Sequence, residues 1–449
     1  MDSGAGVGGP AVAGAECPDD AVVVGVDPTP EPTDGTPADH AEARVIPARA
    51  AVGAGLALSR IVVGLVVAHL ALALFPRDLL HTPLGTLDSG RWLGAFDRWD
   101  AGHYLAVAAH GYPAGDPSVR AYFPVYPLVV RAARALTLDV LSLEQAACLV
   151  SMAAFTASAA LLVRLVGTHL GRRTALASTT LFCWFPTTLF FLAPYPEALL
   201  VLESLVVAVL LDRGRWWWAA AVAGLASATT PEGTVLALAL VVSALVARRG
   251  AVRILGLAVV GVSGLAAYST FLWVRFGNPL GYETAEHSWY RATVVPFTGV
   301  VRNLTSLPAQ VHAVRTTTGV LHTAALDVSW MWLLDDLAVL LGVAAVAALV
   351  VTRTRGRRSD GPPVTGVPIA WIVLLAGIVL VAATTVVRAP GAPISTEADA
   401  RLVGVAFPLY PGLLLLARRR PAVVGAGLVL SAAAALVTQV LFVFGYWVT

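Results

Sequence analysis

The chain has 449 residues, of which 57% are hydrophobic and only 13% are charged, and its formal net charge is +2. Soluble globular chains carry about 25% charged residues, so these proportions exclude an ordinary soluble protein, and the near-neutral charge does not indicate a nucleic-acid partner. The three cysteines, Cys17, Cys148 and Cys183, lack metal-ligand or disulfide spacing, so we expect small buried side chains. We expect neither a metal site nor a cofactor.

Residues 1–48 differ in composition from the rest of the chain. They are rich in Gly, Ala, Pro and Asp and lack apolar periodicity, which predicts a disordered tail. No basic start precedes an apolar core, so this segment does not resemble a signal peptide. The remaining residues, 49–449, are predicted to form one transmembrane domain.

Apolar runs recur along that domain at lengths near the roughly 20 residues that cross a bilayer. Together they predict an all-α polytopic membrane protein with about 11 transmembrane helices. The runs at 216–230 and 233–247 are short and could instead form one broken helix pair. The expected spans are 51–75, 144–166, 174–193, 195–212, 216–230, 233–247, 253–275, 330–352, 366–388, 402–417 and 422–446.

The arginines test this topology, because cytoplasmic loops are enriched in positive charge. With a cytoplasmic N-terminus, every arginine cluster falls on the inner side. The clusters are Arg44 and Arg49; Arg164, Arg172 and Arg173; Arg213 and Arg215; Arg248, Arg249 and Arg253; Arg353, Arg355, Arg357 and Arg358; and Arg418, Arg419 and Arg420. The segments 76–143 and 276–329 are then external loops. Arg60 lies inside the first span, where it either has a partner or lipid headgroup or snorkels to the inner surface.

The first external loop carries the densest group of polar and aromatic side chains. Residues 97–111 lack proline and end at Gly111 and Pro113, which predicts an amphipathic helix. Asp100, His103 and Tyr104 share one face of that helix, at positions i, i+3 and i+4. His110 roughly continues this face. A second interfacial helix is predicted at 124–138.

Acids and aromatics also gather at the other external segments. Glu197 and Glu232 follow prolines at helix starts, where capping and dipole effects are an alternative explanation. The loop at 276–290 contains Glu283, Glu286 and His287, for which solvation explains the composition equally well. Arg401 stands at the outer end of the tenth span. This layout favours an active site at the outer membrane surface over a conduction path, which would place ionisable groups mid-helix.

Several motifs resemble those of the PIG-V-type mannosyltransferases. They are WDAGHYLAVAAHGYP (99–113) with AYFPVYPLVVR (121–131), PYPEALL (194–200), FGNPLGYETAEHSW (276–289) and STEADARLVGVAFPLYP (395–411). The sequence departs from the family pattern in three places. Thr230 stands where an arginine is expected, Pro196 replaces a serine, and Tyr104 stands where Phe is commoner.

The resemblance implies a bacterial member of the family with a GT-C-like glycosyltransferase architecture. It implies transfer of mannose from a polyprenyl-phosphate-linked donor to an acceptor hydroxyl on the external face of the plasma membrane. The acceptor is a glycan, a glycolipid or a protein. A transporter or flippase of a lipid-linked glycan is the rival interpretation, but it would need ionisable residues near mid-membrane and internal repeats.

On this interpretation Asp100, in the matching WDA motif, is the general base, and His103 orients it or a sugar hydroxyl. Asp97 is the reserve base, with helix-dipole stabilisation as its alternative role. Arg401 is expected to bind the leaving phosphate, with Arg131 as second choice and a lipid headgroup as the alternative partner of Arg401. The full set of expected substrate-binding residues is Trp99, Tyr104, His110, Tyr112, Tyr126, Arg131, Glu197, Glu232 and Arg401. For Trp99 and Tyr126, taken singly, an interfacial aromatic belt is the favoured alternative.

Overall fold

The computed structural model describes residues 37–74, 93–306, 323–356, 366–388, 396, 398–446 and 448. The chain divides into the units Met1–Val45 and Ile46–Thr449, and every element that forms the site lies in the second. Most of the predicted tail at 1–48, residues 75–92 with the start of the predicted first external loop, and residues 307–322 of the predicted second external loop lie outside the described residues. Helix α1 begins at Pro37, twelve residues before the expected start of the transmembrane domain.

The described chain is almost entirely helical. Its α-helices are α1 (Pro37–Leu74), α2 (Asp100–His110), α3 (Val125–Leu136), α4 (Leu143–Leu170), α5 (Arg172–Cys183), α6 (Glu197–Asp212), α7 (Trp216–Ala226), α8 (Thr234–Val246), α9 (Ala251–Gly261), α10 (Ser263–Phe276), α11 (Gly281–Ser288), α13 (Thr323–Gly356), α14 (Ile369–Thr384), α15 (Asp399–Val405), α16 (Leu409–Ala417) and α17 (Pro421–Val443). Short 3₁₀ helices are η2 (Gly94–Phe96), η3 (Ser118–Ala121), η4 (Pro186–Phe191) and η5 (Pro231–Gly233). Strands β1 (Arg291–Thr293) and β2 (Thr385–Val387) form an antiparallel pair.

Four described helices are long and apolar enough to cross a membrane, at Arg49–Leu74, Leu143–Leu170, Trp332–Gly356 and Pro421–Val443. Two bent pairs, α9 with α10 and α15 with α16, raise the number to six if each pair is one span. The predicted class of an all-α multi-pass membrane protein is confirmed. The predicted count of eleven spans is not.

Several expected spans are interrupted, mostly at proline. The expected span 174–193 is wrong as a continuous helix, because α5 ends at Cys183 and a 3₁₀ turn starts at Pro186, which cannot donate a helical hydrogen bond. Helices α15 and α16 meet at 89° near Pro408, and α9 and α10 meet at 51°. The expected spans 216–230 and 233–247 are the short helices α7 and α8, separated by the turn at Pro231.

Two isolated predictions can be compared directly with the fold. Arg60 is fully buried and its Nε donates to Thr188 Oγ1 at 3.3 Å, so snorkelling to the surface is the wrong interpretation. Cys148 and Cys183 are buried and free, as expected from the sequence, whereas Cys17 lies outside the described residues.

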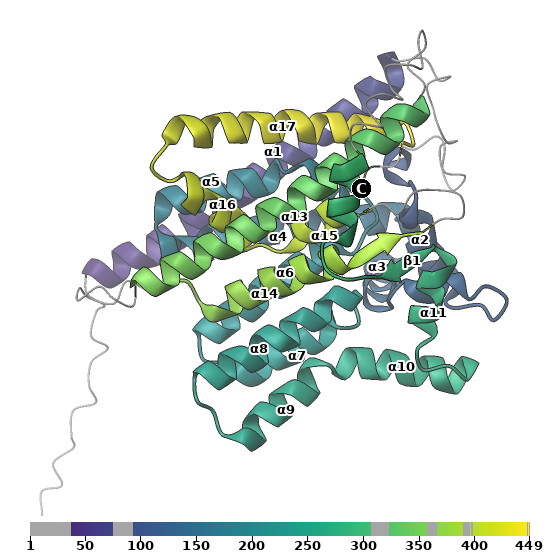
Figure 1. Cartoon of the computed structure of the whole chain (residues 1–449), viewed down its shortest axis with the longest axis horizontal. Helices are drawn as coiled ribbons and strands as arrows, with labels where there is room; N and C mark the ends of the chain where they lie inside the picture. Colours follow the sequence, from purple (N-terminus) through teal and green to yellow (C-terminus); the bar gives the residue numbers. More distant parts are fainter. Residues whose placement is uncertain are drawn as a thin grey trace, which may run out of the picture. The chain divides into compact units, whose positions relative to one another are not determined.

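The elements around the site gather from distant parts of the chain, and Figure 1 shows α2, α3, α11 and β1 near one another. Helix α2 packs on α3 and α4 through an apolar cluster that includes Leu105, Tyr126 and Val130. Arg98, just before α2, donates to the carbonyl of Val443 at 2.7 Å. This hydrogen bond ties the start of the first-loop helix to the end of α17.

Candidate active site

The helix that carries the main motif starts three residues later than the sequence predicts. Helix α2 begins at Asp100, and Trp99 before it has a φ of 56°, a conformation that is costly for a residue with a side chain. The helix ends as expected at Gly111, whose N–H donates to the carbonyl of Val107 at 2.9 Å. Asp100 therefore stands in the first turn of α2, and Asp97 lies outside the helix.

A cavity of about 490 Å³ opens beside this helix. Its walls come from α2 and η3, from the starts of α6 and η5, from the end of α11 and the start of β1, and from α15. The lining residues are Trp99, Asp100, His103, Tyr104, Ala121, Tyr122, Pro196, Glu197, Thr230, Pro231, Glu232, Glu286, Trp289, Arg291, Arg401 and Leu402. Of the predicted site residues, seven meet here: Trp99, Asp100, His103, Tyr104, Glu197, Glu232 and Arg401.

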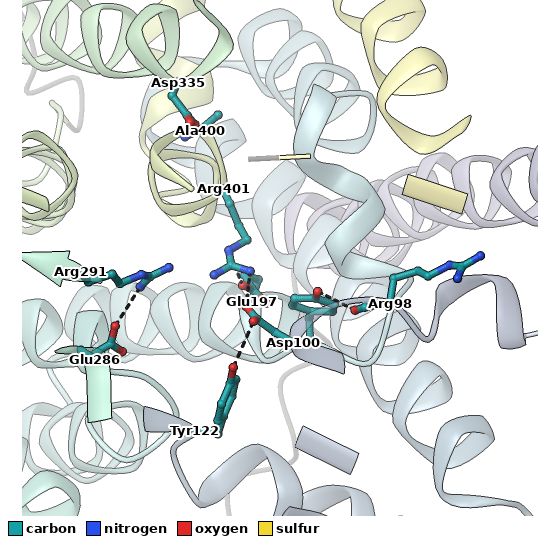
Figure 2. Close-up of polar contacts among 10 residues, drawn as sticks. Arg98, Asp100, Tyr122, Glu197, Glu286, Arg291, Asp335, Ala400 and Arg401 are labelled. Atoms are coloured by element: carbon teal, nitrogen blue, oxygen red, sulfur yellow. Dashed lines mark hydrogen bonds and ion pairs between the residues drawn. The ribbon is translucent and has the colours of Figure 1, made fainter. Parts of the chain in front are cut away.

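An arginine between two carboxylates forms the centre of the cavity wall (Figure 2). Arg401 NH1 lies 2.9 Å from Asp100 Oδ2, and Arg401 Nε lies 3.3 Å from Glu197 Oε1. Tyr122 donates its hydroxyl to the other oxygen of Asp100, Oδ1, at 3.2 Å. Side-chain exposure is 9% for Arg401 and Glu197 and 21% for Asp100, so the group is largely withdrawn from bulk water.

The surrounding charges keep Asp100 ionised. Burial alone would raise the pKa of its carboxyl group, but the charge and hydrogen bond of Arg401, with smaller effects from Arg291 and His103, hold this pKa below its ordinary value. Burial lowers the pKa of His103 despite the nearby Asp100, so its imidazole is neutral at pH 7. That ring stacks on Tyr122 with a centroid distance of 4.7 Å and meets the edge of Trp289 at 5.1 Å.

Three buried polar atoms of residues that line the cavity have no hydrogen-bond partner among the described residues. They are Glu197 Oε2, Thr230 Oγ1 and Arg401 Nε, of which Arg401 Nε still lies 3.3 Å from Glu197 Oε1. Buried polar groups in proteins are nearly always hydrogen-bonded. Glu197 and Thr230 therefore hold unused hydrogen-bonding capacity beside the cavity.

The sequence interpretation missed Trp289, Arg291 and Tyr122 as members of this group. Arg291 opens strand β1, where it pairs with Val387 of β2, and its NH1 lies 3.4 Å from Glu286 Oε2. Burial raises the pKa of the Glu286 carboxyl group, which Arg291 partly offsets. Trp289 is the last residue of the motif FGNPLGYETAEHSW (276–289), so the sequence could have indicated it as a site residue. Arg291 is positioned by a strand partner almost a hundred residues away, which no local pattern reveals.

Five predicted residues do not line the cavity. Asp97 is buried directly after η2 and lies outside α2. Its alternative role, a carboxylate stabilised by the dipole in the first turn of the predicted helix, is therefore wrong. Tyr112 donates to the carbonyl of Tyr122 at 2.6 Å, and Tyr126 donates to the carbonyl of Ala147 at 3.1 Å. Both tyrosines thus hold neighbouring backbone in place. The other two, His110 and Arg131, are exposed.

Among the described residues, no three His, Cys, Asp or Glu side chains come together as a ligand set for a metal ion. The carboxylates of the cavity instead face arginines, tyrosines and a neutral histidine.

Fold and site together define the class: a helical multi-pass membrane protein with an acidic, arginine-containing cavity at the ends of its helices. Within that class, residues 63–261 match the model of the mannosyltransferase (PIG-V) family. The resemblance predicted from the motifs is thereby confirmed over this segment, which contains α2, Tyr122, Glu197 and Thr230. Arg291 and Arg401 lie beyond it.

Individual relatives agree with the family match. The chain is 32% identical over 163 residues to the GPI alpha-1,6-mannosyltransferase 2 of Rattus norvegicus, covering 34% of this chain and 33% of the relative. It is 32% identical over 151 residues to that of Mus musculus, covering 32% and 30%. The matched region thus spans about a third of each relative. A crystal structure of the Archaeoglobus fulgidus oligosaccharyltransferase aligns with a TM-score of 0.41 and 12% identity, covering 86% of this chain and 53% of that one.

Proposed function

We propose that this chain is a membrane glycosyltransferase with a GT-C-like architecture that transfers a mannosyl, or another hexosyl, residue from a polyprenyl-phosphate donor to an acceptor hydroxyl. The observation that carries the proposal is the position of Arg401 between Asp100 and Glu197 on the wall of the cavity. A transferase of this kind needs a base for the acceptor and a cation for the leaving phosphate, and this cluster supplies both. The family match over residues 63–261 supports mannose as the sugar.

Asp100 is the proposed general base. It accepts the proton of the acceptor hydroxyl while the acceptor oxygen forms a bond to the anomeric carbon of the sugar. The bond from that carbon to the phosphate oxygen breaks, and its electron pair leaves with the polyprenyl phosphate. A positioned base of this kind contributes about 100- to 10,000-fold in rate.

Arg401 is the proposed ligand of the leaving phosphate. Its guanidinium group is fixed and nearly buried before the reaction, so it stabilises the developing charge without reorganising. The planar fork of an arginine can hold two phosphate oxygens at once. Arg291, which pairs with Glu286 beside this group, gives the cavity a second cation (Figure 2).

The ion pair between Arg401 and Asp100 also couples donor binding to base strength. An Asp that is held by an arginine is a weak base, because the cation stabilises its ionised form. A donor phosphate that binds Arg401 brings a negative charge close to Asp100 and so raises the pKa of Asp100. The base then becomes strong only when the donor is in place.

The rest of the wall binds the sugars. Glu197 and Thr230 turn their unused polar atoms toward sugar hydroxyls when a ligand binds, and Trp289 offers an aromatic ring on the cavity wall. Tyr104 stays protonated at physiological pH because burial raises the pKa of its hydroxyl well above the ordinary value. Its hydroxyl is therefore a neutral hydrogen-bonding group.

The arginine distribution supports a proposed location for the protein. We propose a plasma-membrane protein with a cytoplasmic N-terminus, with its catalytic cavity on the external face, where the loops 76–143 and 276–329 lie. The acceptor is a glycan, a glycolipid or a protein that is reached at this surface.

The decisive experiment compares the wild-type protein, Asp100→Asn and the control Asp139→Asn in proteoliposomes that contain mannosyl polyprenyl phosphate and a membrane glycan extract. Asp139 lies in the same loop but is exposed, and its side chain pairs with Arg134 at 3.0 Å. We expect Asp139→Asn to keep wild-type transfer and Asp100→Asn to lose at least about a hundredfold. Full activity of Asp100→Asn would exclude Asp100 as the base. A wild type that moves the lipid without transferring sugar would favour a transporter or flippase.

A further inference from the structure

A second cavity, remote from the candidate active site, has the composition of a lipid headgroup site. It has a volume of about 630 Å³ and lies where the end of α13 meets α16 and the start of α17. Four of its lining residues are arginines: Arg355, Arg418, Arg419 and Arg420. None of its lining residues is acidic.

The four arginines have no carboxylate partner within the described part of the chain. No ion pair in that part involves them, and all four side chains are exposed. Four uncompensated cations around one hollow repel one another. An anion that bridges them would relieve this repulsion, so the cavity is complementary to a multiply hydrogen-bonding anionic group.

The distance of this cavity from the candidate active site is close to the thickness of a membrane. Asp335, near the other end of α13, accepts a hydrogen bond from the backbone N–H of Ala400 at 2.7 Å, next to Arg401 of the candidate site (Figure 2). Arg355 stands 20 residues further along the same helix, which at 1.5 Å per residue is about 30 Å. The hydrocarbon core of a bilayer is also about 30 Å thick. The arginine cavity therefore lies at the membrane surface opposite to the candidate active site.

Apart from Thr352, the remaining lining is apolar and partly exposed. Val351, Leu416 and Val423 are 43%, 54% and 52% exposed, and they continue the wall of the arginines toward the membrane interior. Free phosphate would use only the arginines. A phospholipid would use both parts, with its phosphate among the arginines and its acyl chains along these side chains. Basic pockets between transmembrane helices bind anionic lipid headgroups in this manner.

We propose that the cavity formed by Arg355, Arg418, Arg419 and Arg420 is a binding site for an anionic phospholipid. The lipid bridges α13, α16 and α17 at the membrane surface opposite to the catalytic cavity. This inference does not depend on the proposed transferase activity. It assigns to the arginines a specific ligand in addition to their effect on topology.

The test measures thermal unfolding of the full chain in mild detergent with added phosphatidylglycerol, cardiolipin, phosphatidylcholine or inorganic phosphate. The pocket variant is R355Q/R418Q/R419Q/R420Q. The control is R172Q/R173Q/R215Q/R248Q, which removes four exposed arginines that do not line the cavity. For the wild type and the control we expect stabilisation by both anionic lipids, strongest for cardiolipin, and none by phosphatidylcholine. For the pocket variant we expect at least about tenfold weaker apparent affinity.

Three results would overturn the proposal. The first is stabilisation of the pocket variant by anionic lipid to the same extent as the wild type. The second is a loss of apparent lipid affinity in the control as large as in the pocket variant. The third is full reproduction of the lipid effect by inorganic phosphate alone, which would indicate a site for a free anion. If the fourfold variant does not fold, the double variants R355Q/R419Q and R172Q/R248Q are compared by native mass spectrometry. The proposal then requires that R355Q/R419Q retains fewer bound anionic lipids than R172Q/R248Q.

Discussion

Replacement of Arg401 by glutamine is the most informative single perturbation of the candidate site. Arg401→Gln removes the cation that lies 2.9 Å from Asp100 and 3.3 Å from Glu197, and so leaves two carboxylates facing each other in a largely buried place. Breaking a buried ion pair by removing one partner costs about 3–5 kcal/mol. Because Asp100 is 21% exposed to the cavity and partly hydrated, we expect a loss of about 2–4 kcal/mol in the free energy of unfolding.

This loss depends on pH with a definite sign. The pKa of Asp100 is lowered in the folded protein, so the ion pair stabilises the fold above the ordinary carboxylate pKa of about 3.9. That stabilisation disappears as the pH falls through the lowered pKa. The difference in unfolding free energy between the wild type and Arg401→Gln should therefore be largest near neutral pH and shrink in acid.

The assay is denaturant titration of the purified protein in mild detergent at several pH values. The triple variant R401M/D100N/E197Q, in which all three charges are absent, serves as the matched control and should recover most of the lost stability. Two results would refute the assignment of a buried cluster in which Arg401 neutralises the two carboxylates. One is a loss of less than about 0.5 kcal/mol in the free energy of unfolding for Arg401→Gln at neutral pH. The other is a triple variant that is less stable than Arg401→Gln.

Three further variants test separate contacts. Tyr122→Phe removes the hydroxyl that donates to Asp100 Oδ1 at 3.2 Å, so the pKa of Asp100 should rise. The acid limb of the pH profile of kcat/KM should then move to higher pH, and an unchanged acid limb would contradict this contact. Trp289→Ala removes a ring from the cavity wall, so we expect about tenfold lower kcat/KM in transfer assays. An unchanged value would argue against contact with sugar. Thr230→Arg introduces the arginine expected from the family into a cavity wall that has four carboxylates and two arginines. The midpoint of thermal unfolding should therefore stay equal or rise. A clear fall would show that the wall cannot accept the added charge.

Local pattern predicted the parts of the site that depend on one helix. The i, i+3, i+4 spacing of Asp100, His103 and Tyr104 placed all three on one face of α2, and all three line the cavity. Gly111 ended the helix as expected, since its positive φ suits a residue without a side chain. The start of the helix was predicted three residues too early, because nothing in the sequence signals the unusual backbone conformation of Trp99.

Contacts between distant segments could not be predicted in the same way. Asp100 and Arg401 are 301 residues apart, and their pairing depends on how α15 bends at Pro408 and packs against η4 and α6. Tyr112 and Tyr126 were expected to bind substrate because aromatic residues near a motif resemble a binding surface. Their hydroxyls instead bond to backbone carbonyls, a use that only the packed structure reveals. Expected continuous spans failed where prolines interrupt otherwise apolar runs.

The most direct test of the proposed chemistry is the stoichiometry of the transfer itself. Purified wild-type protein and Asp100→Asn are incubated in vesicles with mannosyl polyprenyl phosphate and acceptor extract, and mass spectrometry quantifies donor, free polyprenyl phosphate and glycosylated product. The proposal predicts one polyprenyl phosphate for each sugar transferred by the wild type, and almost none of either product with Asp100→Asn. Release of polyprenyl phosphate without a glycosylated product, or equal turnover by both proteins, would contradict an acceptor-directed transferase that uses Asp100 as its base.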